Sequence, residues 1–257
     1  MGAVAADLVY CGAANHVEAD TGTQGGAIDK NTRIVFSGLE MSITDQVKTY
    51  SDIAITGVWR VYGRDGAGSS VYEDFTYAAE SGEKVGTQAF GRITKVVLQS
   101  GGLAAGATLQ VKEDTAGTTK CYLYGSGVDI LGVEVNEVRR FFLNATRAAS
   151  GDKNLYEKFF VWNSAASDVS SAEVRITADP SSLFTFGVEA ALDGTATVAN
   201  RVTAPAAVTF NDTDKDVPNS GNLTNGTAIG VWIRMTLADD TAAGVTSFNM
   251  QLKGEGF

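Results

Sequence analysis

The sequence predicts an all-β protein made of two β-sandwich domains of jelly-roll or immunoglobulin-like type, one of them inserted into the other. Three observations favour this class. Glycine is abundant (29 residues) and proline scarce (3), which suits many short strands joined by glycine turns. Runs of alternating apolar and polar residues recur at a spacing of roughly ten residues. No segment shows the 3.6-residue period of a long amphipathic helix.

The stretch from Leu155 to Asn163 is the densest aromatic run in the chain, and we expect it to be a central strand. It follows turn residues and is too short for a typical helix. In a strand, Phe159 lies on one face and Phe160 on the other, so both faces carry large apolar groups. We expect a second sheet to cover one face and a neighbouring domain or subunit to cover the other.

Residues 1–45 and 137–257 are expected to form one discontinuous domain. Its clearest strand is 172–178, in which Val174 and Ile176 alternate with charged residues. In the first part we expect short strands at 8–11 and 33–36, loops at 12–16 and 22–26, and a single helical turn at 42–47. In the second part we expect strands at 139–144, 155–163, 172–178, 184–191, 207–210, 228–237 and 247–253.

Residues 46–136 are expected to form the inserted β-domain. Asp65-Gly66 marks a hairpin turn, because glycine accepts the positive φ that such turns require. The glycine-rich stretches at 22–26 and 101–106 are candidate contact segments with neighbouring subunits. The strands expected in the inserted domain are 52–62, 71–77, 93–99, 108–113 and 120–124.

The net charge of −10 argues against two classes of partner. Nucleic-acid binding depends on Lys and Arg that neutralise phosphates, and anionic membranes attract basic segments. We therefore expect neither nucleic acid nor membrane as a partner. The same charge favours solubility at high local concentration.

Cysteine usage and the N-terminus indicate synthesis in a reducing compartment. Cys11 and Cys121 are far apart in sequence, and two cysteines in a chain of 257 residues do not make a disulfide framework. The first seven residues lack the basic start and apolar core of a signal peptide. No apolar run approaches the length of roughly 18 residues that a membrane span needs.

Histidine and glycine patterns give little support to catalysis. The sequence has one histidine, His16, so a Ser-His-Asp triad would have to use it, and no Gly-x-Ser-x-Gly elbow accompanies it. Cys11, His16 and Cys121 are too few and too scattered for a zinc site. Gly63 to Gly68 is glycine-rich but lies in the expected hairpin, so it predicts a turn and not a phosphate-binding loop.

Asp212, Asp214 and Asp216 alternate in a charged loop and are the candidate ligands for Ca²⁺. Carboxylates at alternate positions can hold a hard cation, but an EF-hand needs Gly and Glu where this chain has Val217 and Leu223. A solvated acidic loop is the alternative interpretation. We expect no other metal and no cofactor.

Two further patterns allow alternative functions. The acidic pairs Glu73-Asp74 and Asp239-Asp240 raise the hypothesis of a polysaccharide depolymerase, although adjacent residues of a strand point to opposite faces. Tyr122 and Tyr124 flank Leu123 and share one face of a strand, as in a sugar-binding platform. Packing on a sheet face is the alternative interpretation of the two tyrosines.

Several segments of the chain follow one another in a distinctive order. A short strand is followed by Gly-Ala-Ala-Asn, a Gly-Gly pair, two aromatic strands separated by Gly-Asp, a Thr-Ala-Pro, and a Trp-Ile-Arg strand. The segments are Val9–Asn15, Gly25–Ile28, Phe141–Thr146, Gly151-Asp152, Tyr156–Asn163, Thr203–Pro205, Phe210, Gly221–Leu223, Trp232–Arg234 and Gly254. Together they resemble a family of tailed-bacteriophage virion structural proteins. The residues between Ile28 and Phe141 resemble a second phage β-module. The segments that match it are Ile55–Gly57, Asp65-Gly66, Glu73–Phe75, Gly86–Phe90 and Ile93-Thr94.

The resemblance implies a non-enzymatic virion component that is made in the host cytoplasm and assembles into the particle. Its expected partners are other virion proteins of the capsid, neck, tail or baseplate, together with copies of itself. The resemblance supplies no catalytic residues. A carbohydrate- or receptor-binding module on the virion surface is the alternative function.

Overall fold

The computed structural model describes residues 8–36, 39–143, 145–146, 148, 150–239 and 248–255. Within these residues the regular structure is almost entirely strand, with one short helix, α1 (Pro218–Gly221), so the all-β prediction is confirmed. None of the described helical structure is long and apolar enough to cross a membrane.

The chain divides into two compact units. Unit 1 consists of Met1–Asp29 and Phe141–Phe257, and unit 2 of Lys30–Arg140. Unit 2 begins 16 residues before the expected inserted domain and ends four residues after it. The domain boundaries predicted from the sequence, at 45/46 and 136/137, stay a prediction.

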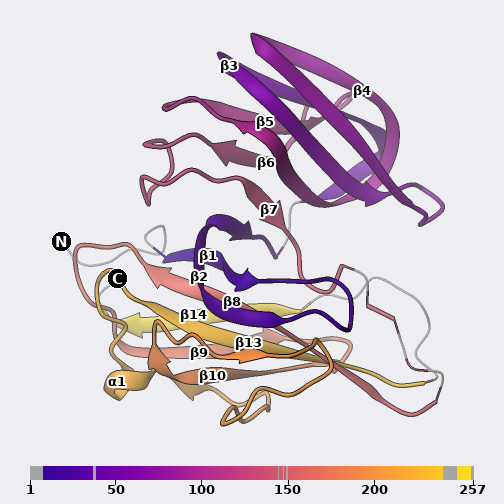
Figure 1. Cartoon of the computed structure of the whole chain (residues 1–257). Helices are drawn as coiled ribbons and strands as arrows, with labels where there is room; N and C mark the ends of the chain where they lie inside the picture. The colour runs from indigo at the N-terminus through magenta and orange to yellow at the C-terminus, as the bar shows by residue number, and fades with distance from the viewer. Residues whose placement is uncertain are drawn as a thin grey trace. The chain divides into compact units, whose positions relative to one another are not determined.

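Unit 1 contains an antiparallel sheet with the aromatic stretch near its middle. The strand order is β10-β13-β8-β1-β2 (Figure 1), and β11 pairs with β2. Phe159 of β8 lies opposite Gly12 of β1 on one side and Val231 of β13 on the other. The strands are β1 (Leu8–Asn15), β8 (Lys153–Asn163), β10 (Phe184–Leu192), β11 (Thr197–Val198), β13 (Ala228–Leu237) and β2 (Gln24–Ile34), of which residues 24–29 belong to unit 1 and residues 30–34 to unit 2.

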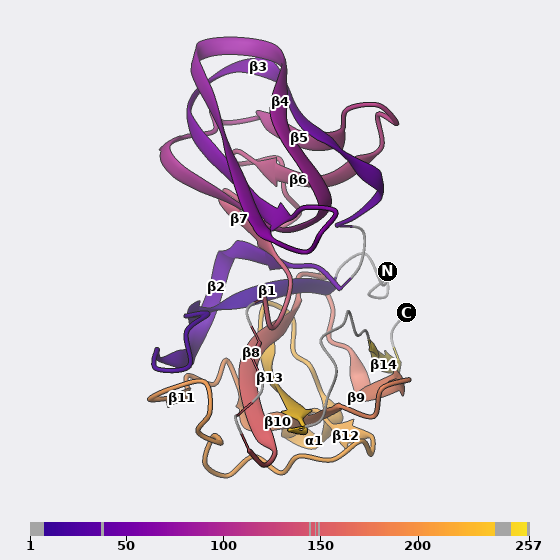
Figure 2. The same cartoon turned by 90° about the vertical axis from the view of Figure 1, so that its right-hand side faces the viewer.

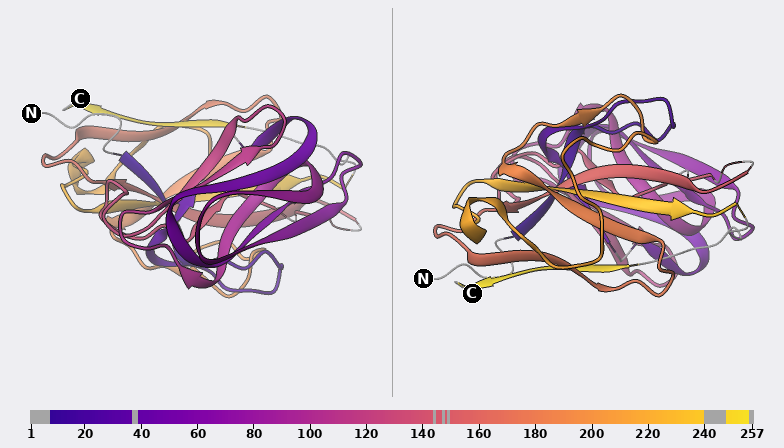
Figure 3. Two further views of the ribbon diagram at one scale, coloured as in Figure 1. Left: turned by 90° about the horizontal axis from the view of Figure 1, so that it is seen from above. Right: turned by 90° about the horizontal axis from the view of Figure 1, so that it is seen from below.

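A smaller sheet completes unit 1. It has the order β12 (Lys215–Asp216), β9 (Ser170–Ala178), β14 (Asn249–Glu255), and Figure 3 shows the yellow β14 running beside β9. Alternation places Val174 of β9 and Leu252 of β14 in the interior. Phe184 of β10 and Phe248, just before β14, bring residues of the two sheets together, with ring centroids 4.3 Å apart.

Unit 2 is built around a long hairpin. In β3 (Glu40–Arg64), Arg64 lies opposite Ser70 and Gly57 opposite Tyr77 of β4 (Ser70–Gly102), so the partner numbers fall as those of β3 rise, as in a hairpin (Figure 2). The later part of β4 pairs with the other side of the same β3 segment, from Arg92 opposite Arg64 to Gly101 opposite Gly57, and so runs antiparallel to β3 as the first part does. β3 also pairs with β5 (Thr108–Glu113), β5 with β6 (Thr119–Tyr124), and β4 with β7 (Glu137–Arg139).

The sheet of unit 2 closes on itself. Tyr124, the last residue of β6, forms an antiparallel bridge with Val135, which leads directly into β7. The backbone N–H of Val135 donates to the Tyr124 carbonyl at 2.7 Å. Closure of this kind leaves few unpaired strand edges and makes a small barrel with one apolar interior.

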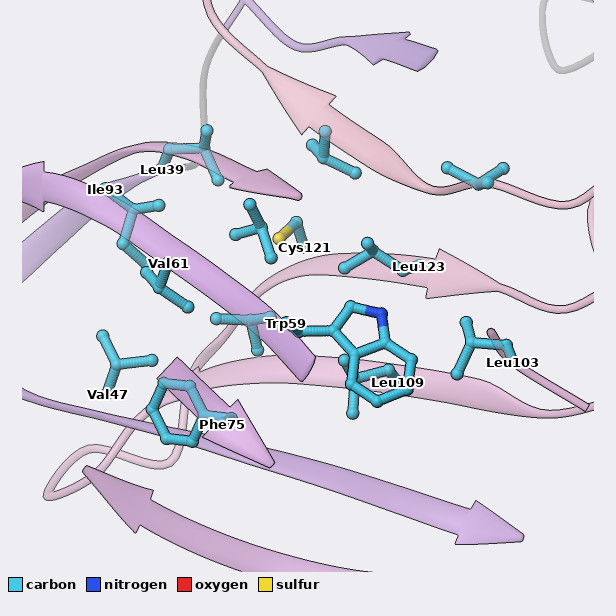
Figure 4. Close-up of a cluster of buried hydrophobic side chains, with 14 of the residues drawn as sticks. Leu39, Val47, Trp59, Val61, Phe75, Ile93, Leu103, Leu109, Cys121 and Leu123 are labelled. Atoms are coloured by element: carbon cyan, nitrogen blue, oxygen red, sulfur yellow. The ribbon is translucent and has the colours of Figure 1, made fainter. Parts of the chain in front are cut away.

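Trp59 lies at the centre of the apolar interior of unit 2. Its side chain is fully buried, and Tyr77 meets it edge-on with ring centroids 5.8 Å apart. Burial of alternate residues along β3, β5 and β6 follows from the two-residue period of a strand. Figure 4 shows Leu39, Val47, Trp59, Val61, Phe75, Ile93, Leu103, Leu109, Cys121 and Leu123 converging in this core.

The predicted turn between the hairpin strands is present. The Asp65 side chain accepts hydrogen bonds from the backbone N–H groups of Ala67 and Ser69, at 2.9 and 2.8 Å. The residue with positive φ is Gly68 (+85°) and not Gly66. An aspartate that bonds the backbone ahead of it, followed by such a glycine, is typical turn chemistry.

Several predicted elements are wrong. Residues 42–47 belong to β3 and are not a helical turn, and 207–210 is not a strand. The expected strand at 139–144 ends at Arg139, and Asn144 lies outside the described residues. Residues 12–15 extend β1, and β2 already begins at Gln24. The last strand is β14, while Ser247 is outside the described residues.

Candidate functional site

The predicted central strand, β8, is covered on both faces. Every residue from Leu155 to Val161 is buried, including the charged Glu157 and Lys158. Phe159 packs edge-on against Phe141, with ring centroids 5.3 Å apart. The prediction of two covered faces is therefore confirmed for this strand.

The second face of β8 is covered by unit 1 itself, and this corrects the expectation of a neighbouring domain or subunit. Tyr156 packs against Phe210 with ring centroids 5.2 Å apart. Val198 and Val208 lie in the same apolar cluster, with the fully buried Trp232. Residues 207–210, expected as a strand, instead form part of an irregular covering segment.

A buried ion pair joins β8 to β10, and its lysine also bonds the chain that follows β10. The Lys158 ammonium lies 2.7 Å from a Glu189 carboxylate oxygen, and neither side chain is more than 5% exposed. Lys158 also donates to the carbonyls of Gly26 and Gly194 at 2.8 and 2.9 Å. The Trp232 indole N–H donates to Glu189 at 3.0 Å. Burial lowers the pKa of Lys158, and the Glu189 carboxylate opposes that shift.

A second buried ion pair joins Arg201, which also lies in the segment that covers β8, to Glu157 of β8. Arg201 and Glu157 are both fully buried, and their charged groups are 2.6 Å apart. Arg201 donates to the Glu18 carbonyl at 2.8 Å, and its guanidinium lies over the Phe142 ring at 5.4 Å. Glu157 also accepts from the Phe142 backbone N–H at 3.0 Å.

These charges form cross-links within unit 1. A buried lysine with a lowered pKa is the type of residue that forms Schiff bases, but three acceptors of unit 1 already engage the Lys158 ammonium. A pair this buried carries a large desolvation cost that good geometry offsets. The arrangement fixes one packing of residues 194–201 against β8.

The candidate Ca²⁺ ligands are not brought together. Asp214 lies 3.2 Å from the Lys253 ammonium, and Asp216 is in β12 beside β9. Lys215, between them, bonds Asn211 at 2.6 Å. Among the described residues no group of three or more His, Cys, Asp or Glu side chains is placed to hold a metal, so Asp212, Asp214 and Asp216 fit the solvated-loop interpretation.

The other residues weighed for catalysis occupy separate places. Cys11 is buried in β1 of unit 1 and Cys121 in β6 of unit 2, and neither is in a disulfide. Glu73 binds the backbone N–H groups of Thr87 and Gln88 at 2.6 and 3.1 Å, while Asp74 pairs with Arg60. Asp240, of the second acidic pair, is outside the described residues.

One glycine-rich contact segment is corrected. Gly25 and Gly26 are buried residues of β2 and not an exposed loop. A Cβ on Gly25 would lie 2.7 Å from the Trp232 ring, so this glycine allows the strand to pass close to the indole. In the second segment, Gly101 and Gly102 end β4, and its proposed contact role stays a prediction.

Tyr122 and Tyr124 lie on the outer face of unit 2, as strand alternation predicts. Their neighbours Cys121 and Leu123 are buried, while Tyr122 is 41% exposed. The two rings are parallel within 5°, with centroids 6.0 Å apart. Burial raises the pKa of Tyr124, and the nearby Asp129 carboxylate adds to the shift.

Two further residues of this face, Gln110 and Tyr50, were not predicted from the sequence. Gln110 of β5 lies directly opposite Tyr122, and Tyr50 of β3 lies directly opposite Gln110. Alternation within β3 and β5 indicates which residues share a face of each strand. The register that aligns them depends on contacts between residues 60 positions apart, which local patterns do not specify.

Comparisons with known proteins identify no family for this chain. No family model matches it, and no curated protein matches it. Among solved structures, two mutant forms of oxalate decarboxylase from Bacillus subtilis are 9% and 10% identical to it. Each match covers 93% of this chain and 79% of that chain, with TM-scores of 0.13 and 0.14.

Proposed function

We propose that this protein is a non-enzymatic structural component of a tailed-bacteriophage virion. It is made in the host cytoplasm and assembles with itself and with other virion proteins of the capsid, neck, tail or baseplate. The proposal begins from the sequence resemblance. It is supported by the role that the resembling residues have in unit 1.

The observation that carries the proposal is the meeting of those residues around β8. Tyr156, Phe210 and Trp232 come from three of the matching segments and lie in one buried cluster. Gly25, from a fourth segment, has no side chain that would collide with the Trp232 ring. The Arg234 guanidinium lies over the Phe210 ring at 5.7 Å. The residues that resemble the phage family are thus residues that pack in the interior of unit 1. Residues selected for packing suit a protein whose role is structural.

The distribution of charge supports assembly through unit 2. Unit 1 has 8 Lys and Arg against 17 Asp and Glu, a net charge of −9, whereas unit 2 has 12 against 13, a net charge of −1. Like charges repel, so the unit 1 surfaces of neighbouring copies disfavour close contact. Unit 2 also exposes large apolar side chains, among them Ile43 (54%), Tyr72 (57%) and Ile130 (59%).

Mass spectrometry of purified particles tests the proposal. Virions are collected from cultures of the host that carries the gene, banded in a density gradient and digested, and peptides of this protein are counted against those of the major capsid protein. We expect a fixed ratio to the capsid protein across the particle band. Presence in the soluble lysate with absence from the band overturns the proposal. A host cytoplasmic protein of similar abundance is the control for carry-over.

A further inference from the structure

The outer face of β3, β5 and β6 in unit 2 presents an aligned row of side chains. Tyr50, Gln110 and Tyr122 are direct cross-strand partners, so they share one face of three adjacent strands. Strands are about 4.8 Å apart, which places the backbones of the two outer tyrosines about 10 Å apart with the amide between them. Tyr124 continues the row along β6, opposite Thr108.

The polar groups of this row make no hydrogen bond to other described residues of the protein. In the described part of the chain, no hydrogen bond reaches the hydroxyls of Tyr50, Tyr122 or Tyr124, or the side-chain amide of Gln110. The buried Tyr77 shows the contrast, because its hydroxyl lies 2.9 Å from the Thr49 hydroxyl. The row therefore has donors and acceptors available to a ligand.

Another pair of tyrosines in unit 2, Tyr62 and Tyr72, has its ring faces covered by cationic side chains. Tyr62 and Tyr72 are neighbours on the hairpin, and the Arg60 guanidinium lies over the Tyr72 ring at 4.3 Å. The Lys95 ammonium lies over the Tyr62 ring at 4.8 Å. On the β6 surface, no cation among the described residues lies over the parallel rings of Tyr122 and Tyr124, and Lys112 lies over the Tyr50 ring at 5.1 Å.

We propose that this row, formed by Tyr50, Gln110, Tyr122 and Tyr124, binds neutral carbohydrate. A sugar ring has an apolar C–H face and a rim of hydroxyls. Aromatic faces match the first, and an amide or phenol matches the second, since each both donates and accepts hydrogen bonds. None of the four side chains is charged, and the two charged side chains that flank Tyr50, Glu83 opposite it in β4 and Lys112 over its ring, have opposite signs, which favours neutral sugars over acidic ones.

Single-stranded nucleic acid is the other ligand that stacks on aromatic rows, and the charge disfavours it. Nucleic-acid grooves combine stacking residues with cations that follow the phosphates. Here the cations near the row include Lys112, over Tyr50, and Arg33, near Tyr124, and Arg33 is already paired with Asp129. Unit 2 as a whole has a net charge of −1. The inference does not rest on the virion role, because a chain absent from particles still carries this surface.

An oligosaccharide array tests the inference with the full chain. The probes are immobilised neutral gluco-, galacto- and manno-oligosaccharides, with single-stranded DNA as a separate probe. We expect binding to at least one neutral sugar, weakened about tenfold by Tyr122→Ala or Tyr124→Ala. Tyr122→Phe is expected to weaken binding less, because it keeps the ring and loses only the hydroxyl. Because the contacts are uncharged, raising the salt concentration is expected to leave the affinity unchanged.

Tyr72→Ala is the matched control, because Tyr72 is an exposed tyrosine on another strand of unit 2. It is expected to leave sugar binding unchanged, and circular dichroism verifies that all variants fold. Three results overturn the inference: binding to none of the sugars, an equal loss in Tyr72→Ala, or binding of the DNA alone.

Discussion

At the residue scale, the Lys158–Glu189 pair makes the sharpest prediction about stability. Lys158→Met leaves a buried carboxylate without its counter-charge, and such a loss costs about 3–5 kcal/mol. We expect the free energy of unfolding to fall by that amount in urea titrations. Adding Glu189→Gln removes the orphaned charge and is expected to recover part of the loss.

Lys253→Met is the control for this pair. Lys253 pairs with Glu173 and Asp214 at the surface, where it is 40% exposed. Surface ion pairs contribute about 0–1 kcal/mol, so this variant is expected to stay close to the wild type. An equal loss in both variants would contradict the cross-linking role of Lys158.

The Asp168 carboxylate predicts a change of stability with pH. Hydrogen bonds from the Asn225 backbone N–H and the Asn222 side chain, at 2.8 and 2.9 Å, lower its pKa below the ordinary value of 3.8. The unfolded chain then binds the proton more readily than the folded chain. The stabilisation is present above about pH 4 and is lost as the pH falls through the lowered pKa.

Asp168→Asn is expected to reduce this acid-sensitive part of the stability. Unfolding midpoints in urea at about pH 5 and about pH 3 should fall less on acidification in the variant than in the wild type. Asp212→Asn is the control, because no hydrogen bond to Asp212 occurs among the described residues. Identical pH profiles for wild type and Asp168→Asn would refute the prediction.

The two thiols are predicted to be unreactive in the folded protein. Cys11 is fully buried, and burial raises the pKa of Cys121 to about 12. Only the thiolate attacks alkylating and disulfide reagents, so at neutral pH the folded chain offers almost none. A colorimetric thiol assay is expected to detect no fast-reacting group in buffer and two in denaturant. A fast-reacting thiol in buffer would show that one of these sites opens.

At the scale of the element, β2 shows how a glycine pair can serve a strand. Gly25 has φ +89°, and a Cβ there would meet both the Trp232 ring and the Ala196 carbonyl. Gly25→Ala therefore combines backbone strain of about 1–2 kcal/mol with overpacking of about 1–3 kcal/mol. Gly226→Ala has similar strain (φ +76°) in open space and is the control. Thermal unfolding should show a clearly larger loss for Gly25→Ala.

The same strand shows where prediction from the sequence stops. Glycine pairs are typical of turns, and only the approach of Trp232, some 200 residues later, explains Gly25 as a strand residue. Segments with clear alternation, such as Ala172 to Ala178, were predicted correctly because local period determines which side chains are buried. Residues 42–47 lack such a period, and they become strand through pairing with β4 and β5.

In the row of Tyr50, Gln110, Tyr122 and Tyr124, too, one part is predictable from neighbouring residues and the other part depends on residues far away in the sequence. The alternation around Leu123 was enough to place Tyr122 and Tyr124 on one face of β6. Whether that face is outer or inner depends on which residues fill the barrel, and Cys121 and Leu123 do so. Tyr50 and Gln110 join the row only through the register of β3 and β5.

At the scale of the whole molecule, unit 2 is predicted to fold without unit 1. Its core cluster is made entirely of residues between Leu39 and Val138, and its sheet closes through Tyr124 and Val135. A closed sheet with its own core meets the requirement for independent folding. A fragment of residues 30–140 is therefore expected to unfold cooperatively in urea.

Comparing that fragment with residues 46–136 tests the boundaries of the unit. The shorter fragment lacks Leu39, Met41 and Val138, all buried in the core cluster, and the Leu39 carbonyl that accepts from the Ile93 N–H at 2.9 Å. Loss of buried side chains of this size costs about 2–5 kcal/mol each in intact proteins. Trp59 is the only tryptophan in either fragment, so its fluorescence reports unfolding of the core directly. We expect residues 30–140 to be more stable by at least about 3 kcal/mol, and equal stability would favour the boundaries at 45/46 and 136/137.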